Sequence, residues 1–512
     1  MRLFRDVFHR LRLAGFLDPG QALEAAAALL ADARPDQPQR LFAAGALLRQ
    51  AVVFLPFDPA LAAQARRIFP AAPPPPGFVR WLDGLRAPAD PGPARSLAQA
   101  LNAWQTGGRS AFLAETEALL TSPGGAAAAP LLAWGLRAAG KPEQAARALD
   151  HAPENFLARN LRARLALDED HPEEARAHLL ASLELEPFQP SAIMQLAAPP
   201  PDPNLVETRR VHICLYSWNK PEALARTLAS LAATELGPAR VTLLNNGSTS
   251  ISPKELEALA RRTAPNLRLE VLHLPVNVGA PPARNWLLGL PASREADCVA
   301  FLDDDVLLPR RWLAGLLSAL EAEPRACAAG VKVLHPRSPL VIQYAWRFFS
   351  ETGAGRIRFT PNAPTVLDLG QYDHLRPCLS VMGCCHLLHR ERLERLGVPG
   401  FDPRFSPSQV DDIEHDLQIW KAGGMVVFDG RAAVVHLQDT GDPSRRTPLS
   451  LAQAQANHFK MEHKFDGGEL ADMRRDVERA DSEAFRAALA AVSPFLPAPA
   501  REFWRTLSPF LP

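Results

Sequence analysis

The sequence places three aspartates directly after a short apolar run, in the stretch Val299-Ala300-Phe301-Leu302-Asp303-Asp304-Asp305. The apolar run predicts a buried strand, and Pro309 with Arg310 to Leu313 begins a helical pattern. Carboxylates at the carboxyl end of a strand lie where open α/β sheets bind their ligands. They repel one another unless a cation lies between them, and Mg²⁺ and Mn²⁺ prefer such oxygen ligands. The stretch predicts a divalent-metal site; taken alone, it also fits a solvated acidic turn.

The overall composition excludes some classes of partner. The chain has 512 residues, enough for two or three domains, and Lys+Arg and Asp+Glu balance at 56 each. This balance gives no general attraction to nucleic acid, and we expect no nucleic-acid partner. No apolar run reaches the length of a membrane span, and the basic amphipathic start, residues 1–13, lacks the features of a secretory signal. We therefore expect no transmembrane segment and a cytoplasmic location.

The six cysteines lie in the middle of the chain without metal-type spacing, so buried thiols in a reducing compartment are expected. The adjacent pair Cys384-Cys385 leaves a redox role open as the lesser alternative.

Residues 1–200 carry Ala, Leu and Arg helix patterns broken by Pro and Gly, which predict an α-helical domain. The proline run 71–77 is expected to be extended. The segment that begins at Lys141-Pro142-Glu143 is echoed thirty positions later by His171-Pro172-Glu173. This pattern resembles a tetratricopeptide repeat and predicts helical hairpins over about 126–196, with a true repeat array as the lesser alternative. The proline-rich segment 197–203 reads as a linker.

From Arg210 onward, strand-like and helix-like segments alternate. Strands are predicted at 211–215, 240–244 and 267–272, and helices at 221–231, from Ser252 with a capping-box spacing, and at 283–290. This alternation predicts an α/β domain over 205–445 with a mostly parallel, doubly wound sheet. Beyond it, 446–512 is predicted to be a helical extension with helices at 449–464 and 468–492, whose aromatic residues dock on the main body.

Seven fragments in this region follow one another in a recognisable order. They are Leu215–Glu222, Leu243–Thr249, Asn277-Val278-Gly279 with Ala283-Arg284-Asn285, Asp303–Asp305, Met382-Gly383, Val410–Glu414, and His436. Together they resemble a family 2 glycosyltransferase with the A-type nucleotide-sugar fold, over roughly residues 209–440. The resemblance implies a Rossmann-like domain that binds a nucleotide-diphosphate sugar.

The resemblance also implies roles for individual residues. The nucleotide-sugar site would contain Ser217, Trp218, Asn245, Asn246, Arg284 and Asp304. Asp303, Asp305 and His436 would hold Mn²⁺ or Mg²⁺ in an Asp-x-Asp motif, where the ion stabilises the leaving diphosphate. Asp412 would be the catalytic base that accepts the acceptor hydroxyl's proton. Each role has an alternative: Asp411 and Asp412 could be helix-start acids, His436 an ordinary strand-end histidine, and Trp218 a packing residue.

The sequence departs from the family pattern at two points. Asparagines occupy 245 and 246 where the turn after the second strand usually carries aspartate, which leaves the nucleotide preference open. The base motif reads Asp-Asp-Ile-Glu at 411–414 in place of the commoner Glu-Asp-x-Asp. Segment 330–377 matches no motif; its aromatics could bind acceptor sugars or pack over the sheet.

We therefore expect an inverting, metal-dependent glycosyltransferase that moves a sugar from a nucleotide-diphosphate sugar to a hydroxyl acceptor. The acceptor would be a saccharide, or a protein presented by the helical domain, which could also bind another protein partner. Two alternatives remain: a non-catalytic scaffold with a degenerate transferase domain, and a sugar-nucleotide nucleotidyltransferase. The sequence leaves the donor base, the sugar and the oligomeric state open.

Overall fold

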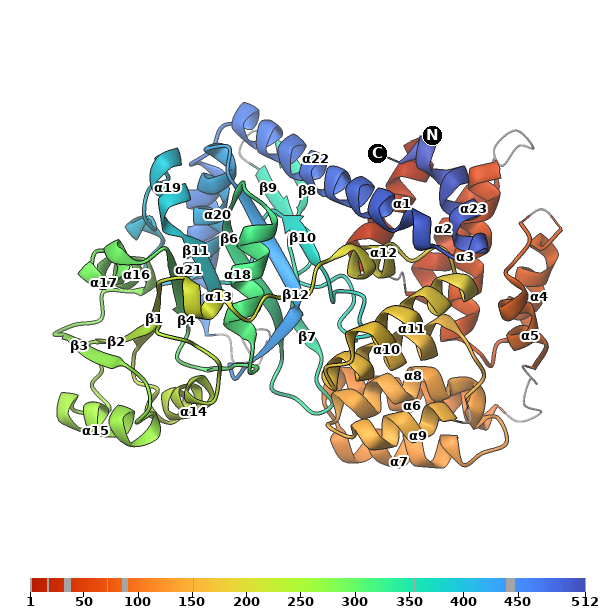
Figure 1. Ribbon diagram of the computed structural model, residues 1–512, viewed down its shortest axis with the longest axis horizontal. Coiled ribbons are helices and arrows are strands. Elements are labelled where there is room, and N and C mark those ends of the chain that lie inside the picture. Colours follow the sequence, from red (N-terminus) through yellow and green to blue (C-terminus); the bar gives the residue numbers. More distant parts are fainter. Residues whose placement is uncertain are drawn as a thin grey trace.

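The computed structural model describes residues 2–15, 18–31, 38–70, 72–84, 91–150, 152–353, 356–438 and 447–511. The predicted domain boundary at 445/446 lies outside the described residues, as do Met1, Asp32, Ala71 and the pair 354–355 within the 330–377 segment. The three domain limits therefore stay predictions. Figure 1 shows the helical N-terminal region on one side, the sheet on the other, and the long helix α22 crossing between them.

The N-terminal region is helical, as the sequence predicts. Its helices are α1 (Arg2–Ala14), α2 (Pro19–Ala31), α3 (Pro38–Phe54), α4 (Pro59–Ile68), α5 (Pro76–Gly84), α6 (Gly92–Thr106), α7 (Arg109–Leu120), α8 (Gly125–Ala138), α9 (Pro142–Asp150), α10 (Phe156–Asp168), α11 (Pro172–Leu185) and α12 (Pro190–Ala197). The pairs α8–α9 and α10–α11 pack as neighbours in the predicted hairpin region. The prediction that residues 71–77 are extended is wrong for the last two residues, because α5 begins at Pro76. Proline is tolerated in the first turn of a helix.

A mixed α/β layer follows the short helix α13 (Leu205–Thr208). Its strands are β1 (Val211–Ser217), β2 (Arg240–Asn246), β3 (Leu269–Leu274), β4 (Cys298–Leu302), β5 (Val306–Leu307), β6 (Ala326–Leu334), β7 (Ile342–Tyr344), β10 (Leu375–Cys378), β11 (Cys385–His389) and β12 (Met425–His436), with β8 (Phe349–Gly353) and β9 (Arg356–Phe359) in a separate hairpin. The helices are α14 (Pro221–Ala232), α15 (Pro253–Thr263), α16 (Ala280–Leu288), α17 (Pro291–Glu295), α18 (Trp312–Ala322), α19 (Arg390–Leu396) and α20 (Asp411–Lys421), with the 3₁₀ turn η1 (Pro403–Phe405). The predicted capping box at Ser252 and Glu255 is present at the start of α15.

The strand order is β10-β12-β6-β11-β4-β1-β2-β3. Strands β3, β2, β1 and β4 are parallel, as expected from alternating strands and helices. Beyond them the sheet is mixed, because β11 enters between β4 and β6 and runs antiparallel to both. The prediction of a mostly parallel sheet therefore holds for the half of the sheet formed by β3, β2, β1 and β4. The predicted α/β class is confirmed.

The C-terminal region is helical, with α21 (Pro448–Glu462), α22 (Gly467–Val492) and α23 (Ala498–Leu507), and the 3₁₀ turns η3 (Ser493–Phe495) and η4 (Ser508–Phe510). Helix α22 joins two apolar cores: Met473 and Val477 pack with the sheet core, and Phe485 and Leu489 pack with the helical core. Asp481, between these halves, is buried and accepts hydrogen bonds from Arg12 at 2.6 Å and Arg376 at 2.7 Å. The predicted docking of the tail holds for Phe503 and Trp504, whereas Phe495 is exposed.

Candidate active site

The carboxyl ends of the parallel strands β1 and β4 bring the first polar groups of the site together. The two strands pair with Leu215 opposite Leu302, so the residues that follow each strand face one another. Tyr216 donates a hydrogen bond to Asp303 over 2.9 Å, and Ser217 donates one to Asp304 over 2.7 Å. Two of the three aspartates are thus oriented by side chains from β1.

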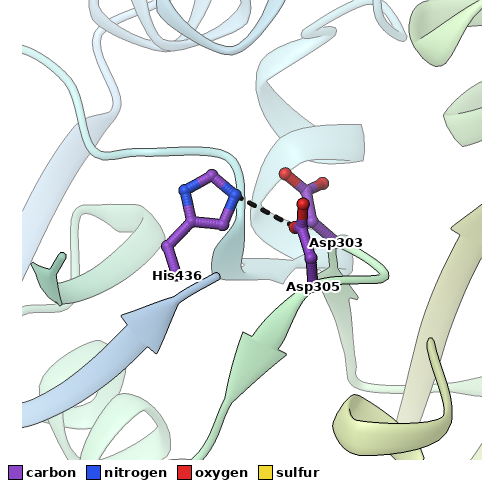
Figure 2. Close-up of side chains that lie close together, drawn as sticks. All are labelled: Asp303, Asp305 and His436. Atoms are coloured by element: carbon purple, nitrogen blue, oxygen red, sulfur yellow. Dashed lines mark hydrogen bonds and ion pairs between the residues drawn. The ribbon is translucent and has the colours of Figure 1, made fainter. Parts of the chain in front are cut away.

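Asp303, Asp305 and His436 form a cluster that could hold a metal ion (Figure 2). One potential ligand atom from each residue lies within 4.8 Å of the others. His436 ends β12, where it pairs with Val306 of β5, and this register brings its ring to Asp305. Two carboxylates and an imidazole suit Mn²⁺ or Mg²⁺, with the nitrogen favouring Mn²⁺. The predicted set of metal ligands is therefore brought together.

Gln343 orients the His436 ring. The His436 Nδ1 atom lies 3.0 Å from the Gln343 amide oxygen, and its Nε2 atom lies 3.0 Å from an Asp305 oxygen. The Gln343 amide nitrogen donates to the Gln438 carbonyl at 3.2 Å, which turns its oxygen toward the ring. A partner on Nδ1 directs Nε2 toward the carboxylates, which is the arrangement of a metal-binding histidine with a supporting residue.

The Lys220 side chain also enters this cluster. Its Nζ atom lies 2.8 Å from Asp305, 3.4 Å from Asp304 and 2.6 Å from the Gln438 side-chain oxygen. Lys220 immediately precedes α14, at the edge of the loop that follows β1. The ammonium group partly neutralises the two carboxylates that it contacts.

The surroundings separate the pKa values of the three aspartates. Burial raises the pKa of Asp304 to about 6, although Lys220 opposes the rise. Burial also raises the pKa of Asp303, against the charge of Arg284. Burial acts in the same direction on Asp305, but the hydrogen bond and charge of His436, with Lys220, lower its pKa to about 2. Asp305 is therefore the carboxylate most firmly held in the ionised form that metal binding requires.

The predicted base, Asp412, lies beside the Met382-Gly383 turn. The Gly383 amide donates to Asp412 over 2.9 Å, and Asp412 remains partly exposed in the first turn of α20. A side chain at Gly383 would place its Cβ 2.7 Å from an Arg284 nitrogen and 3.0 Å from the Asp412 Cβ atom. Glycine is therefore needed for this close approach.

Asp411 has a different environment from its neighbour. It is buried and lies 2.6 Å from Arg284, whose side chain is 4% exposed and reaches to 3.9 Å from Asp303. Burial raises the pKa of Asp411 to about 6, although Arg284 favours the ionised form. Arg284 therefore links Asp303, one of the predicted metal ligands, to Asp411 at the start of α20, next to the predicted base Asp412.

The backbone just before α20 is held in an unfavourable conformation. Gln409 has φ 80° and Val410 has φ 59°, values that a β-branched residue rarely adopts. The Asn457 amide of α21 donates to the carbonyls of Phe405 and Ser408 at 2.9 Å and of Gln409 at 3.2 Å. These contacts maintain the strained turn that sets the direction of Asp412.

The predicted nucleoside contacts are only partly available. The Asn245 amide bonds to His273 at 3.1 Å and to the Ser248 backbone at 3.0 Å. The Asn246 amide bonds to Asn277 and to the Val278 backbone, each at 3.0 Å. Both asparagines therefore brace loops, and their predicted contact with the base stays a prediction. Trp218 is 50% exposed, so part of its ring is accessible, and both its predicted nucleotide contact and the packing alternative stay open.

The 330–377 segment connects the sheet to the helical region. Its aromatic residues Tyr344, Trp346, Phe348 and Phe349 are buried, which leaves their faces unavailable to a sugar. Trp104 of α6 donates to the Leu340 carbonyl at 3.0 Å, and Arg164 of α10 pairs with Asp373 at 3.2 Å. For these four aromatic residues, the structure therefore supports packing within the protein and not the binding of acceptor sugars.

Sequence reasoning missed Lys220, Gln343 and Tyr216 as members of the site. Lys220 and Tyr216 belong to the fragment Leu215–Glu222, so their position beside Ser217 was a usable signal. Gln343 lies in an unmatched segment, and only the fold brings it to His436.

An acidic cluster with an imidazole, at the carboxyl edge of an α/β sheet and beside a partly exposed carboxylate, is consistent with the class of glycosyltransferases. Residues 212–397 match Glycosyl transferase family 2. These residues are therefore a family 2 glycosyltransferase domain, which confirms the resemblance for that part of the chain. Asp412 and His436 lie beyond the matched residues.

Several known proteins are similar to this chain. The O-antigen biosynthesis protein RfbC of Myxococcus xanthus is 30% identical over 236 residues, which are 45% of this chain and 17% of that protein. An N-acetylglucosaminyl-diphospho-decaprenol L-rhamnosyltransferase of Mycobacterium tuberculosis is 28% identical over 256 residues, which are 47% of this chain and 77% of that protein. A mannosyltransferase of Pyrobaculum calidifontis, solved with GDP-Man and Mn²⁺, is 19% identical with a TM-score of 0.37, over 65% of this chain and 92% of that one.

No helix in the described part of the chain is both long and apolar enough to cross a membrane. All six cysteines are free and buried, as the sequence predicts, and burial raises the pKa of Cys384 and Cys385 well above the usual range. A high thiol pKa disfavours the reactive thiolate, so the lesser alternative of a redox pair has no support here.

Proposed function

We propose that this protein is an inverting, metal-dependent glycosyltransferase that uses a nucleotide-diphosphate sugar. The observation that carries the proposal is the cluster of Asp303, Asp305 and His436, joined to the start of α20 through Arg284. A divalent ion held by the three ligands would supply Lewis-acid stabilisation of the leaving diphosphate. The protein's own residues would orient the donor and receive a proton.

The donor would lie along the carboxyl ends of β1, β2 and β4. Trp218 offers a half-exposed ring for a nucleoside, and Asn245 and Asn246 would hold the neighbouring loops through their bonds with the Ser248 and Val278 amides. Asp304 would contact the nucleotide sugar, with Ser217 holding its carboxylate. Arg284 adds a buried positive charge beside the aspartates.

Asp412 would accept the proton of the acceptor hydroxyl as that oxygen attacks the anomeric carbon. Its carboxylate is partly exposed and is fixed by the Gly383 amide, which suits a group that must meet an incoming acceptor. One base and a single displacement predict inversion at the anomeric carbon. A saccharide acceptor is favoured by the two curated relatives, whose names refer to O-antigen biosynthesis and to a diphospho-decaprenol-linked sugar.

The helical region, over 1–200, would bind the acceptor or a protein partner. Its support is the direct contact with the 330–377 segment, which also supplies Gln343 to the site. Binding to the helical region would therefore be able to shift the 330–377 segment and, through Gln343, the orientation of the His436 ring.

The test is nucleoside diphosphate release from UDP-, GDP- and dTDP-sugars with Mn²⁺, with and without saccharide acceptors. We expect one donor to turn over, chelator and Asp305→Ala to abolish release, and the product to have inverted anomeric configuration by NMR. Absence of donor binding with any metal would favour the scaffold alternative. Retained turnover in chelator would reject the metal role.

A further inference from the structure

The ammonium group of Lys220 lies among the groups that would bind the metal. Its Nζ atom donates hydrogen bonds to Asp305 at 2.8 Å and to the Gln438 side-chain oxygen at 2.6 Å, and it forms an ion pair with Asp304 at 3.4 Å. An ammonium has three N–H donors and no acceptor, so this position satisfies it. Lys220 is therefore held firmly as long as no other cation takes its place.

Lys220 and a metal ion compete for the same carboxylate. One Asp305 oxygen lies 3.0 Å from His436 and the other accepts a hydrogen bond from Lys220, so an ion bound by Asp305 would share its ligand with the ammonium. A divalent ion bound by Asp305 would also lie close to the ammonium, and two positive charges at such a distance repel strongly. This repulsion favours displacement of Lys220 from Asp305 when the ion binds.

The structure allows this movement without disturbing the loop. The Lys220 side chain is 41% exposed, and its stem is flexible. The preceding residue, Asn219, is fixed by hydrogen bonds from the Thr249 and Ser250 amides, at 2.7 and 2.9 Å. The backbone is therefore held, while the partly exposed side chain is able to turn away from the carboxylates.

We propose that Lys220 is a counter-cation that occupies the metal ligands in the donor-free protein and transfers to the donor's diphosphate when the ion binds. The proposal rests on the proposed function for the diphosphate, but its exchange with metal can be measured without turnover. It makes Lys220 a positioning residue that couples two ligands: the ion binds weakly alone, and binds tightly with a nucleoside diphosphate that receives the displaced ammonium.

The experiment measures Mn²⁺ affinity by electron paramagnetic resonance, with Mn²⁺ alone and then with UDP, GDP or dTDP. Lys220→Met is compared with the wild type, with Lys220→Arg, and with Lys254→Met, an exposed lysine on α15 as the matched control. We expect Lys220→Met to bind Mn²⁺ alone about tenfold more tightly, because a competing charge is gone. The tightening by nucleoside diphosphate should shrink by a similar factor, whereas the other two variants should resemble the wild type.

Equal or weaker Mn²⁺ binding in Lys220→Met, or absence of Mn²⁺ binding in every protein, would overturn the proposal. A thermal melt verifies that each variant is folded. If no sugar nucleotide turns over but Lys220→Met still binds Mn²⁺ more tightly, the transferase proposal fails and the exchange stands. If turnover depends on Mn²⁺ but wild type and Lys220→Met bind it equally, only the exchange fails.

Discussion

Substitution of the adjacent residues Asp411 and Asp412 should affect different properties: stability for Asp411 and catalysis for Asp412. Asp412 is partly exposed and accepts a hydrogen bond from the Gly383 amide, which an asparagine oxygen can also accept. Asp412→Asn should therefore fold normally while losing the proton acceptor. General base catalysis typically contributes a factor of about 10² to 10⁴, so kcat should fall by that factor, equal to about 3 to 5 kcal/mol in activation free energy.

Asp411→Asn should instead weaken the fold. It leaves the buried Arg284 guanidinium with Asp303, at 3.9 Å, as its nearest carboxylate. Removing one partner of a buried pair costs about 3 to 5 kcal/mol. Burial raises the pKa of Asp411 to about 6, which indicates that the ion pair with Arg284 does not fully offset the cost of burying the carboxylate. We therefore expect a loss of stability at the lower end of this range. About 3 kcal/mol corresponds to a fall in melting temperature of roughly 6 to 12 °C for a domain of this size.

Both variants are compared at pH 7.5, above the pKa of Asp411. Thermal melts give the stability, nucleoside diphosphate release gives kcat, and titration with the active donor gives its affinity. The reasoning is refuted if Asp412→Asn keeps kcat within a factor of about three of the wild type. It is equally refuted if Asp411→Asn melts at the wild-type temperature, since Arg284 would then need no partner.

Three further predictions concern stability and positioning. Burial lowers the pKa of His212 and His415 to about 4, so between pH 6.5 and 4 these histidines bind protons in the unfolded chain but not in the folded one. The free energy of unfolding should therefore fall by about 3 kcal/mol for each histidine as the pH drops from 6.5 to 4. In urea melts, His212→Gln should show a weaker dependence of stability on pH than the wild type. Asp481→Asn, which leaves two buried arginines without their partner, should lower the free energy of unfolding by about 3 to 5 kcal/mol in urea melts. The control Asp476→Asn, at a partly exposed position on the same helix, should change it by under about 1 kcal/mol. Gly383→Ala should lower both kcat and donor affinity in steady-state assays, because its Cβ would displace the base Asp412 and the donor-site Arg284 at a cost of about 1 to 3 kcal/mol. An unchanged kcat would show that the turn adapts.

The elements that could be predicted are those set by local sequence. The apolar run before Asp303 predicted β4, and the Ser252 to Glu255 spacing predicted the capped start of α15. The ligand cluster was also accessible, because parallel strand ends meet at one edge and the fragments resembled a known family.

The elements that could not be predicted depend on long-range pairing. Strand β11 enters the sheet antiparallel to β4, and no local pattern reports the direction of a strand. The same holds for Gln343, which reaches His436 across 93 positions. Polar residues were also ambiguous: Asn245 and Asn246 resembled ligand contacts, but their amides satisfy neighbouring loop groups, an option that every asparagine has.

Helix α22 has a consequence for how the chain is made. In the helical core, Phe8 packs against Phe485 with ring centroids 5.6 Å apart, although the two residues are separated by almost the whole sequence. At ribosomal rates of about 5 to 20 residues per second, Phe8 emerges roughly 20 to 100 s before its partner is synthesised. During that interval α1 can pack against α2 and Phe188, but the part of its apolar face that α22 and α23 cover in the folded protein stays exposed until these helices are synthesised.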